Sequence, residues 1–181
     1  NSIFTIQNSL SQNNKERNLN KMKRNSYFTL IELLVVIAII AILAGMNSID
    51  VDGVTGNIHT NFDGKAKAAA DALLKDGADL VYVHLEAPDE CGHQGDAEGK
   101  TRSLEIIDEK VIGYIKKQLD DAGEDYTFLV MPDHPTPVST KTHSRERVPA
   151  VIYKKGDNKN SGLRFIESDA EKFGEKIEVG Y

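Results

Sequence analysis

Three short clusters of aspartate and histidine carry residue types that could do chemistry. The first contains Asp89 and His93, the second contains Asp133 and His134, and the third contains His143. Carboxylate oxygens and imidazole nitrogens together suit a borderline divalent ion such as Zn²⁺ or Mn²⁺. The clusters therefore indicate a metal-binding protein, and their spacing bears on how many ions it holds.

The spacing differs between the first two clusters. Asp89 and His93 can reach one ion if Gly92 permits a tight turn, whereas the neighbours Asp133 and His134 point in different directions in an extended segment. The second pair could therefore contact two ions, as in a two-metal site. One such pair alone is more often an ordinary turn with a solvated histidine. Three clusters, each at the edge of a predicted strand, favour the metal site.

The elements that must position these clusters alternate between strands and helices. Apolar, β-branched runs predict strands over 79–85, 127–131 and 149–153, and a short strand with a turn within 47–56. Helices are predicted over 64–76 and over 98–122, the second with an apolar face and an end at Gly123. This alternation predicts an α/β fold with a mostly parallel sheet flanked by helices. Open sheets of that kind place their sites where strands end.

Residues 1–46 have a different character. The polar, Asn-rich segment 1–21 is expected to be disordered, or to be untranslated upstream sequence if translation starts at Met22. From Phe28 to Met46 the chain is almost wholly apolar and would span about 28 Å as a helix, close to the thickness of a bilayer core. A transmembrane-type helix is therefore predicted, with a buried core helix as the alternative. Basic residues just before it place the N-terminus in the cytoplasm by the positive-inside rule.

Charge and the remaining candidate residues narrow the function. The chain has a net charge of −6, with the basic excess in residues 1–46 and the acidic excess in residues 47–181, which argues against a nucleic-acid partner. The single cysteine, Cys91, permits no internal disulfide and fits a reducing compartment. Cys91 is expected to be a small filler residue rather than a ligand. His84 could face the site, and a position in the core or behind the ligands is the equal alternative, whereas His59 is expected on the surface or in a loop.

The same clusters carry a family resemblance. The segments 50–69, 83–96, 130–137 and 142–149 resemble the 2,3-bisphosphoglycerate-independent phosphoglycerate mutases of the alkaline phosphatase superfamily, in the type common in archaea and many anaerobic bacteria. The resemblance covers residues 47–181. It implies an incomplete alkaline-phosphatase-like sheet and a cytoplasmic isomerase of glycolysis. Such enzymes interconvert 3-phosphoglycerate and 2-phosphoglycerate through a phosphoserine, with two divalent metal ions: Mn²⁺, or alternatively Zn²⁺, Mg²⁺ or Co²⁺.

The resemblance also implies a ligand set. Asp89, His93 and His143 would bind one ion, and Asp133 and His134 the other. In that family an N-terminal strand supplies a further Asp ligand, and the nucleophilic serine follows soon after it; neither motif is found here. We therefore expect this partial mutase domain to be inactive alone. The hydroxyls near the clusters do not match the nucleophile position: Thr142, Ser103, Ser139 and Ser144.

A second resemblance covers residues 22–46. The run from Phe28 to Glu32, followed by the apolar segment, is similar to the N-terminal methylation segment of type IV pilins and pseudopilins. It implies cleavage before Phe28 and pairing of Glu32 with the new amine of a neighbouring subunit. Tyr27 stands where that family normally has Gly. The alternative function is thus a membrane-anchored, pseudopilin-like structural protein of the inner membrane, and a third interpretation is a fusion of the two families.

Overall fold

The computed structural model describes residues 45, 47–157 and 159–173. The chain divides into two compact units, Asn1–Asp50 and Val51–Tyr181. The predicted transmembrane-type helix, with Phe28 and Glu32, lies outside the described residues apart from Gly45. In the part of the chain that is described, no helix combines the length and apolarity needed to cross a bilayer.

Both predicted helices are confirmed in the second unit, whereas the helices over 87–94 and 167–173 were not predicted from the sequence. The one expected over 64–76 runs two residues earlier, and the one expected over 98–122 is built from three consecutive segments that end at Gly123, where φ is 78°. Asn61 Oδ1 accepts a hydrogen bond from Gly64 N at 2.8 Å, which begins the first helix. The helices are α2 (Phe62–Leu74), α3 (Ala87–Gln94), α4 (Ala97–Ile106), the π-helix η1 (Ile107–Ile112), α5 (Gly113–Ala122) and α6 (Glu167–Phe173).

The described sheet has two strands, β1 (Thr127–Val130) and β2 (Val151–Lys154). They pair antiparallel, with Phe128 opposite Tyr153. The prediction of a mostly parallel sheet is wrong for this pair. A parallel pairing needs a crossover, usually through a helix, whereas residues 131–150 contain turns and bends but no helix. That loop carries two of the three Asp/His clusters.

The strand predicted over 79–85 is extended but forms no ladder, because no described strand lies beside it. Its side chains still alternate as in a strand. Val81, Val83 and Leu85 pack against the core, while Leu80 and Tyr82 are 73% and 68% exposed. The short strand expected within 47–56 is also absent, and residues 52 and 53 form a turn. The apolar, β-branched run thus predicted the extended backbone of this segment correctly and its pairing in a sheet wrongly.

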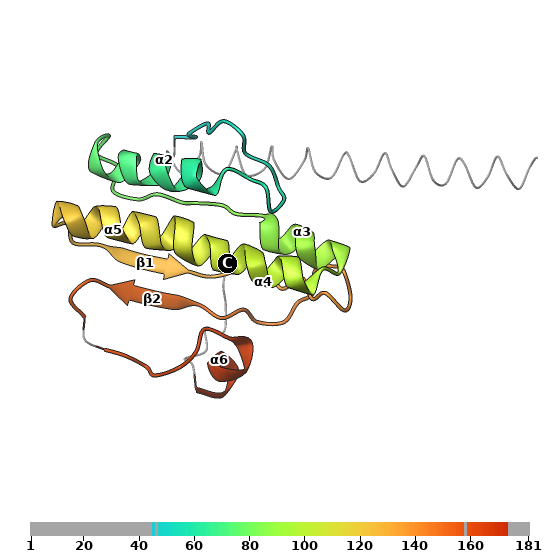
Figure 1. Cartoon of the computed structure of the whole chain (residues 1–181). Helices are drawn as coiled ribbons and strands as arrows, with labels where there is room; N and C mark the ends of the chain where they lie inside the picture. Colours follow the sequence, from blue (N-terminus) through green and yellow to red (C-terminus); the bar gives the residue numbers. More distant parts are fainter. Residues whose placement is uncertain (1–44, 46, 158, 174–181) are drawn as a thin grey trace, which may run out of the picture. The chain divides into compact units, whose positions relative to one another are not determined.

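The core lies between α2 and the long helix formed by α4, η1 and α5. Figure 1 shows α2 running alongside α5, with β1 next to α5 and β2 on the far side of β1. Alanines on α2, including the fully buried Ala66, let the helices approach closely. The buried cluster comprises Phe62, Ala66, Ala69, Ala87, Val111, Ile115 and Leu119.

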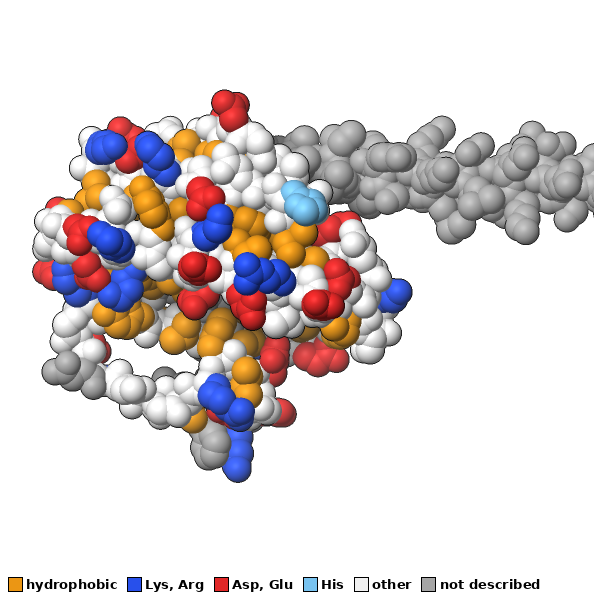
Figure 2. Space-filling model, viewed as in Figure 1, with side chains coloured by type: hydrophobic (Ala, Val, Ile, Leu, Met, Phe, Trp, Pro, Cys, Tyr) orange, Lys and Arg blue, Asp and Glu red, His pale blue; other side chains and the backbone are white. Residues whose placement is uncertain are grey.

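The outer face of the long helix is polar. Figure 2 shows acidic and basic side chains interspersed over it, with hydrophobic surface between them. On α5, Lys116 pairs with Asp120 at 2.6 Å and Lys117 pairs with Asp121, each four residues apart. Exposed pairs of this kind contribute little to the free energy of unfolding, because water and salt screen them. Helix packing, and not surface charge, therefore determines the stability of this layer.

The packing of α5 makes a testable prediction about stability. Leu119 is 5% exposed and Leu104 is 53% exposed, although both lie on the same long helix. Leu119→Ala should lower the free energy of unfolding by about 2–4 kcal/mol, because it leaves a cavity. Leu104→Ala, the matched control, should change it by less than about 1 kcal/mol. Urea denaturation of the full chain, followed by circular dichroism, measures both. Equal losses would contradict the core as described.

Candidate metal centre

The first two candidate ligands lie on one face of α3. Asp89 and His93 are four residues apart on this helix, so their side chains project in the same direction. Asp89 Oδ2 and His93 Nε2 are 3.3 Å apart. The sequence-based expectation of a tight turn at Gly92 is wrong: a helix, not a turn, brings these side chains together.

Gly92 has a different role, which is to let another segment approach α3. A β-carbon built at Gly92 would lie 2.5 Å from the carbonyl oxygen of Thr136 and 2.9 Å from its methyl carbon. Any side chain at this position would therefore push the loop after β1 away from the helix. The loop is held there by Lys100 of α4, whose Nζ donates to the Thr136 carbonyl at 2.6 Å.

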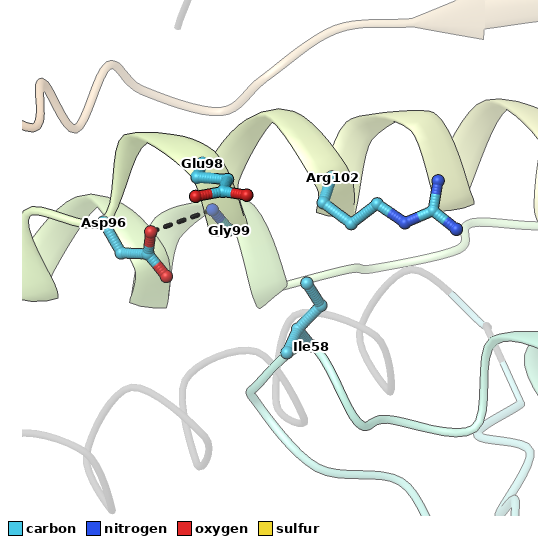
Figure 3. Close-up of a pocket in the computed structure, with 5 residues that line it drawn as sticks. All are labelled: Ile58, Asp96, Glu98, Gly99 and Arg102. Atoms are coloured by element: carbon cyan, nitrogen blue, oxygen red, sulfur yellow. Dashed lines mark hydrogen bonds between the residues drawn. The ribbon is translucent and has the colours of Figure 1, made fainter.

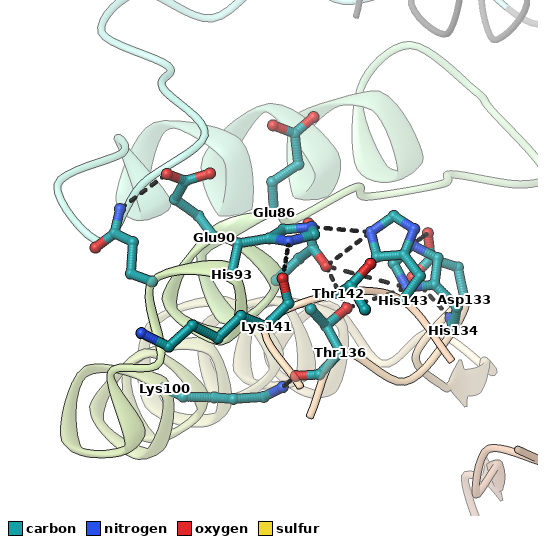
Figure 4. A network of polar contacts seen from close by, with 12 residues as sticks. Glu86, Glu90, His93, Lys100, Asp133, His134, Thr136, Lys141, Thr142 and His143 are labelled. Carbon is teal, nitrogen blue, oxygen red and sulfur yellow. Dashed lines mark hydrogen bonds and ion pairs between the residues drawn. The ribbon is translucent and has the colours of Figure 1, made fainter. Parts of the chain in front are cut away.

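His143 comes from the same loop and completes a three-residue cluster. Its Nε2 lies 3.0 Å from His93 Nε2 and 3.3 Å from Asp89 Oδ1. Figure 4 shows the His143 ring pointing toward that of His93. Ligands about 2.1 Å from an ion are about 3.0 Å apart at right angles and about 3.4 Å apart at tetrahedral angles. The spacing of Asp89, His93 and His143 therefore fits a shared divalent ion.

The hydrogen bond made by His93 Nδ1 supports this fit. His93 Nδ1 lies 3.0 Å from the carbonyl oxygen of Lys141, and only a protonated Nδ1 can donate to that acceptor. In the neutral ring, Nε2 then carries a lone pair and faces the Asp89 carboxylate, which is another acceptor. A hydrogen on His143 Nε2 can donate to His93 Nε2. It leaves the contact between His93 Nε2 and Asp89 Oδ2 without a donor. Two acceptors that converge in this way repel each other, and a divalent ion bound between them would remove that repulsion, so the geometry fits a pair of metal ligands.

Lys141 presents that carbonyl from an unusual backbone conformation. Its φ is 56°, in the left-handed region that residues other than glycine rarely adopt. Such conformations cost of order 1 kcal/mol or more and often occur at functional sites. Here the positive φ of Lys141 accompanies the hydrogen bond between its carbonyl oxygen and His93 Nδ1, which orients the His93 ring.

Asp133 and His134 lie beside the cluster. His134 Nε2 is 3.3 Å from Asp133 Oδ2, so the two side chains face each other and do not point apart as expected from the sequence. His134 Nδ1 is 4.0 Å from Asp89 Oδ1, and the His134 and His143 ring centroids are 3.7 Å apart. The described part of the chain thus brings all five candidate ligands into one region.

The other candidates lie outside the ligand cluster. Cys91 is buried, and burial, followed by the nearby carboxylates of Asp96 and Glu90, raises the pKa of its thiol. His84 lies in the extended segment, 3.4 Å from Glu86, and His59 is exposed. These placements agree with a filler cysteine and a surface His59.

Sequence reasoning missed two residues that contact or hold the site. The Thr136 hydroxyl donates to Asp89 Oδ1, and Lys100 holds the Thr136 main chain. Thr136 stands two residues after His134, inside the second cluster, and this proximity was the only available signal. Partners of this kind orient metal ligands in many proteins.

A separate hollow lies at the start of α4. Figure 3 shows its lining, which combines Asp96, Glu98 and Arg102 with Ile58 and Gly99. Its volume is about 290 Å³ and it is open to solvent. Asp96 Oδ1 caps α4 by accepting from Gly99 N at 2.9 Å, and Arg102 pairs with Glu105. These groups therefore have local structural partners, and the hollow contains none of the candidate ligands.

Comparison with known families agrees with the metal-site chemistry. Residues 5–176 match the family described as the Metalloenzyme superfamily. Since this match covers most of the described fold, the chain belongs to that superfamily.

Individual relatives are more specific. The 2,3-bisphosphoglycerate-independent phosphoglycerate mutase of Methanosarcina acetivorans is 43% identical over 135 residues, which are 75% of this chain and 34% of that enzyme. The mutase of Methanothrix thermoacetophila is 44% identical over the same length and the same shares of each chain. A solved protein of Pyrococcus horikoshii has a TM-score of 0.62 at 31% identity, over 71% of this chain and 37% of that one. The chain spans about a third of the length of these relatives.

The burial of Cys91 makes a prediction that separates a filler from a ligand. A thiol reacts as its thiolate, which burial disfavours, so Cys91 should react with Ellman's reagent at least about tenfold more slowly in the folded chain than in urea. Cys91→Ser should leave the amount of bound Mn²⁺ unchanged. Rapid labelling of the folded chain that Mn²⁺ blocks would instead identify Cys91 as a ligand.

Proposed function

We propose that this chain provides the metal-binding part of a phosphoglycerate mutase that interconverts 3-phosphoglycerate and 2-phosphoglycerate. The observation that carries the proposal is the convergence of Asp89, His93 and His143, with two acceptors facing each other at 3.3 Å. The names of the relatives at 41–44% identity support the particular reaction.

In this proposal the ligands form two sets. Asp89, His93 and His143 hold one divalent ion, and Asp133 and His134 hold a second one. Mn²⁺ is the first candidate by the family resemblance, and Zn²⁺, Mg²⁺ and Co²⁺ are the alternatives, since mixed carboxylate and imidazole ligands accept several divalent ions. When bound, such ions activate a hydroxyl nucleophile and stabilise the negative charge of a phosphoryl group during its transfer.

The candidate ligands differ in how far their side chains are exposed, and one side of the site is open to solvent. The side chains of His143 and Asp133 are 50% and 60% exposed, so an anionic substrate can approach from their side. His93 and Asp89, at 37% and 35%, lie deeper against α3. His134 is 30% exposed, so the open side of the site is formed by His143 and Asp133 in particular.

The nucleophile is proposed to come from elsewhere. The Thr136 hydroxyl contacts Asp89, but this residue is only 3% exposed and its proton is already donated. Ser103 is fully buried and donates to Lys100 O, so it is equally unsuited to attack a substrate. We therefore expect the chain alone not to isomerise 3-phosphoglycerate. Turnover by the purified full chain with Mn²⁺, at a rate above a metal-free control, would overturn this point.

The pilin-like segment supports a second candidate function. We propose three parts: residues 1–21 as an upstream segment, 22–46 as a pilin-like leader with a hydrophobic helix, and 47–181 as the partial mutase domain. In the alternative, Phe28 and Glu32 belong to a membrane-anchored pseudopilin-like protein of the inner membrane. Fractionation of cells that express the full chain separates the two candidates, since the mutase alone is expected in the cytoplasmic fraction.

The metal centre itself is tested by ligand substitution. The full chain should bind Mn²⁺, and Asp89→Ala or His143→Ala should abolish binding at this site or weaken it by about 100-fold or more, because each removes a direct ligand. Equilibrium dialysis followed by metal analysis gives the stoichiometry, and isothermal titration calorimetry gives the affinity.

Matched controls are available on the same unit. Asp108 of η1 and His59 are exposed and lie outside the ligand set, so Asp108→Ala and His59→Ala should bind Mn²⁺ like the wild type. Unchanged stoichiometry in both ligand variants would sink the proposed site.

A further inference from the structure

We propose that Thr136 is a positioning residue of the metal centre, which orients one ligand from each of the two proposed sets through a single hydroxyl. The inference rests on the proposed metal site, because it concerns the ligands of that site. Thr136 lies in the loop after β1 and is 3% exposed. Its hydroxyl therefore acts on its neighbours and not on a substrate in solvent.

The first contact holds Asp89. Thr136 Oγ1 donates to Asp89 Oδ1, since an ionised carboxylate can only accept. This hydrogen bond keeps the carboxylate in the orientation in which Oδ2 faces His93 and Oδ1 faces His143. Without it, the carboxylate could rotate away from both rings.

The second contact selects the tautomer of His134. Thr136 Oγ1 has one proton, which it donates to Asp89, so at the 3.2 Å contact with His134 Nδ1 it must accept. His134 therefore carries its proton on Nδ1, and in the neutral ring Nε2 presents a lone pair toward Asp133 Oδ2 at 3.3 Å. The Lys141 carbonyl imposes the same tautomer on His93. In the neutral form of both rings, Nε2 then faces a carboxylate oxygen with its lone pair free, which is the arrangement that metal ligation requires.

Thr136 is in turn fixed by its own surroundings. Lys100 Nζ holds its carbonyl, and its methyl group packs on the space that Gly92 leaves free. A β-branched side chain has restricted freedom at χ1, and these two contacts restrict it further. Threonine therefore supplies a hydroxyl at a fixed position, whereas serine would supply the same hydroxyl with more freedom.

The test compares Thr136→Val with Thr136→Ser in the full chain. Valine keeps the shape and removes the hydroxyl, and it should weaken Mn²⁺ binding by about 10-fold to 100-fold, the usual effect of losing an outer partner of a ligand. Serine should stay within about threefold of the wild type. Thr101→Val, which removes a hydroxyl on α4 that bonds only to Ala97 O, is the control and should bind normally. Equal weakening by valine and serine would overturn the inference.

A second measurement does not depend on metal. The unfolding equilibrium constant is measured in a chelator for Thr136→Val, for Asp89→Ala and for the double variant. If the two side chains are coupled, the change in the double variant should differ by about threefold or more from the product of the two single changes. Additive effects, with normal Mn²⁺ binding by the wild type, would overturn the role of Thr136 and leave the metal centre standing. A wild type that binds no Mn²⁺ would overturn the metal centre and, with it, this role.

Discussion

The contact between Gly92 and Thr136 is the constraint on which the candidate site depends. Two residues that are far apart in sequence meet so closely that a single added carbon would lie 2.5 Å from a backbone oxygen. This contact seats the loop after β1 on the face of α3 that carries Asp89 and His93. Because His134 and His143 belong to the same loop, their positions follow from where it is seated. A hydrogen bond from Lys100 of α4 to the Thr136 carbonyl holds the loop in this position.

The candidate site holds hydrogen-bond acceptors close together, because histidine Nε2 atoms face carboxylate oxygens. The backbone carbonyl of Lys141 and the hydroxyl of Thr136 each accept from the Nδ1 atom of one histidine, which leaves the Nε2 lone pairs directed at carboxylates. Acceptors that face each other repel unless a cation lies between them. The protein meets that repulsion with rigid elements: a helix, a close backbone contact and a residue with positive φ. Such preorganisation is what a metal centre needs, because ligands already held in place lose little freedom on binding.

The segment 79–85 shows that a strand forms only where a neighbouring strand can pair with it. Residues 79–85 have the conformation of a strand, and their inward side chains pack on the core, yet they pair with no described strand. Apolar side chains on the other face remain exposed in this segment and in both strands, including Leu80, Leu129 and Ile152 at 73%, 60% and 72%. The antiparallel pairing of β1 with β2 follows from the helix-free loop that joins them.

The sequence by itself determined the elements and the ligand types. Helix patterns and the stop at Gly123 placed α2 and the long helix to within a few residues, and the Asp and His clusters indicated a divalent metal. These features are local, so the chain encodes them within a few positions. Tertiary structure alone decided that the loop after β1 brings His143 to Asp89 and His93, and that Thr136 donates to Asp89. Those outcomes depend on distances between segments some 40 to 50 residues apart, which packing around Gly92 sets and no local pattern records.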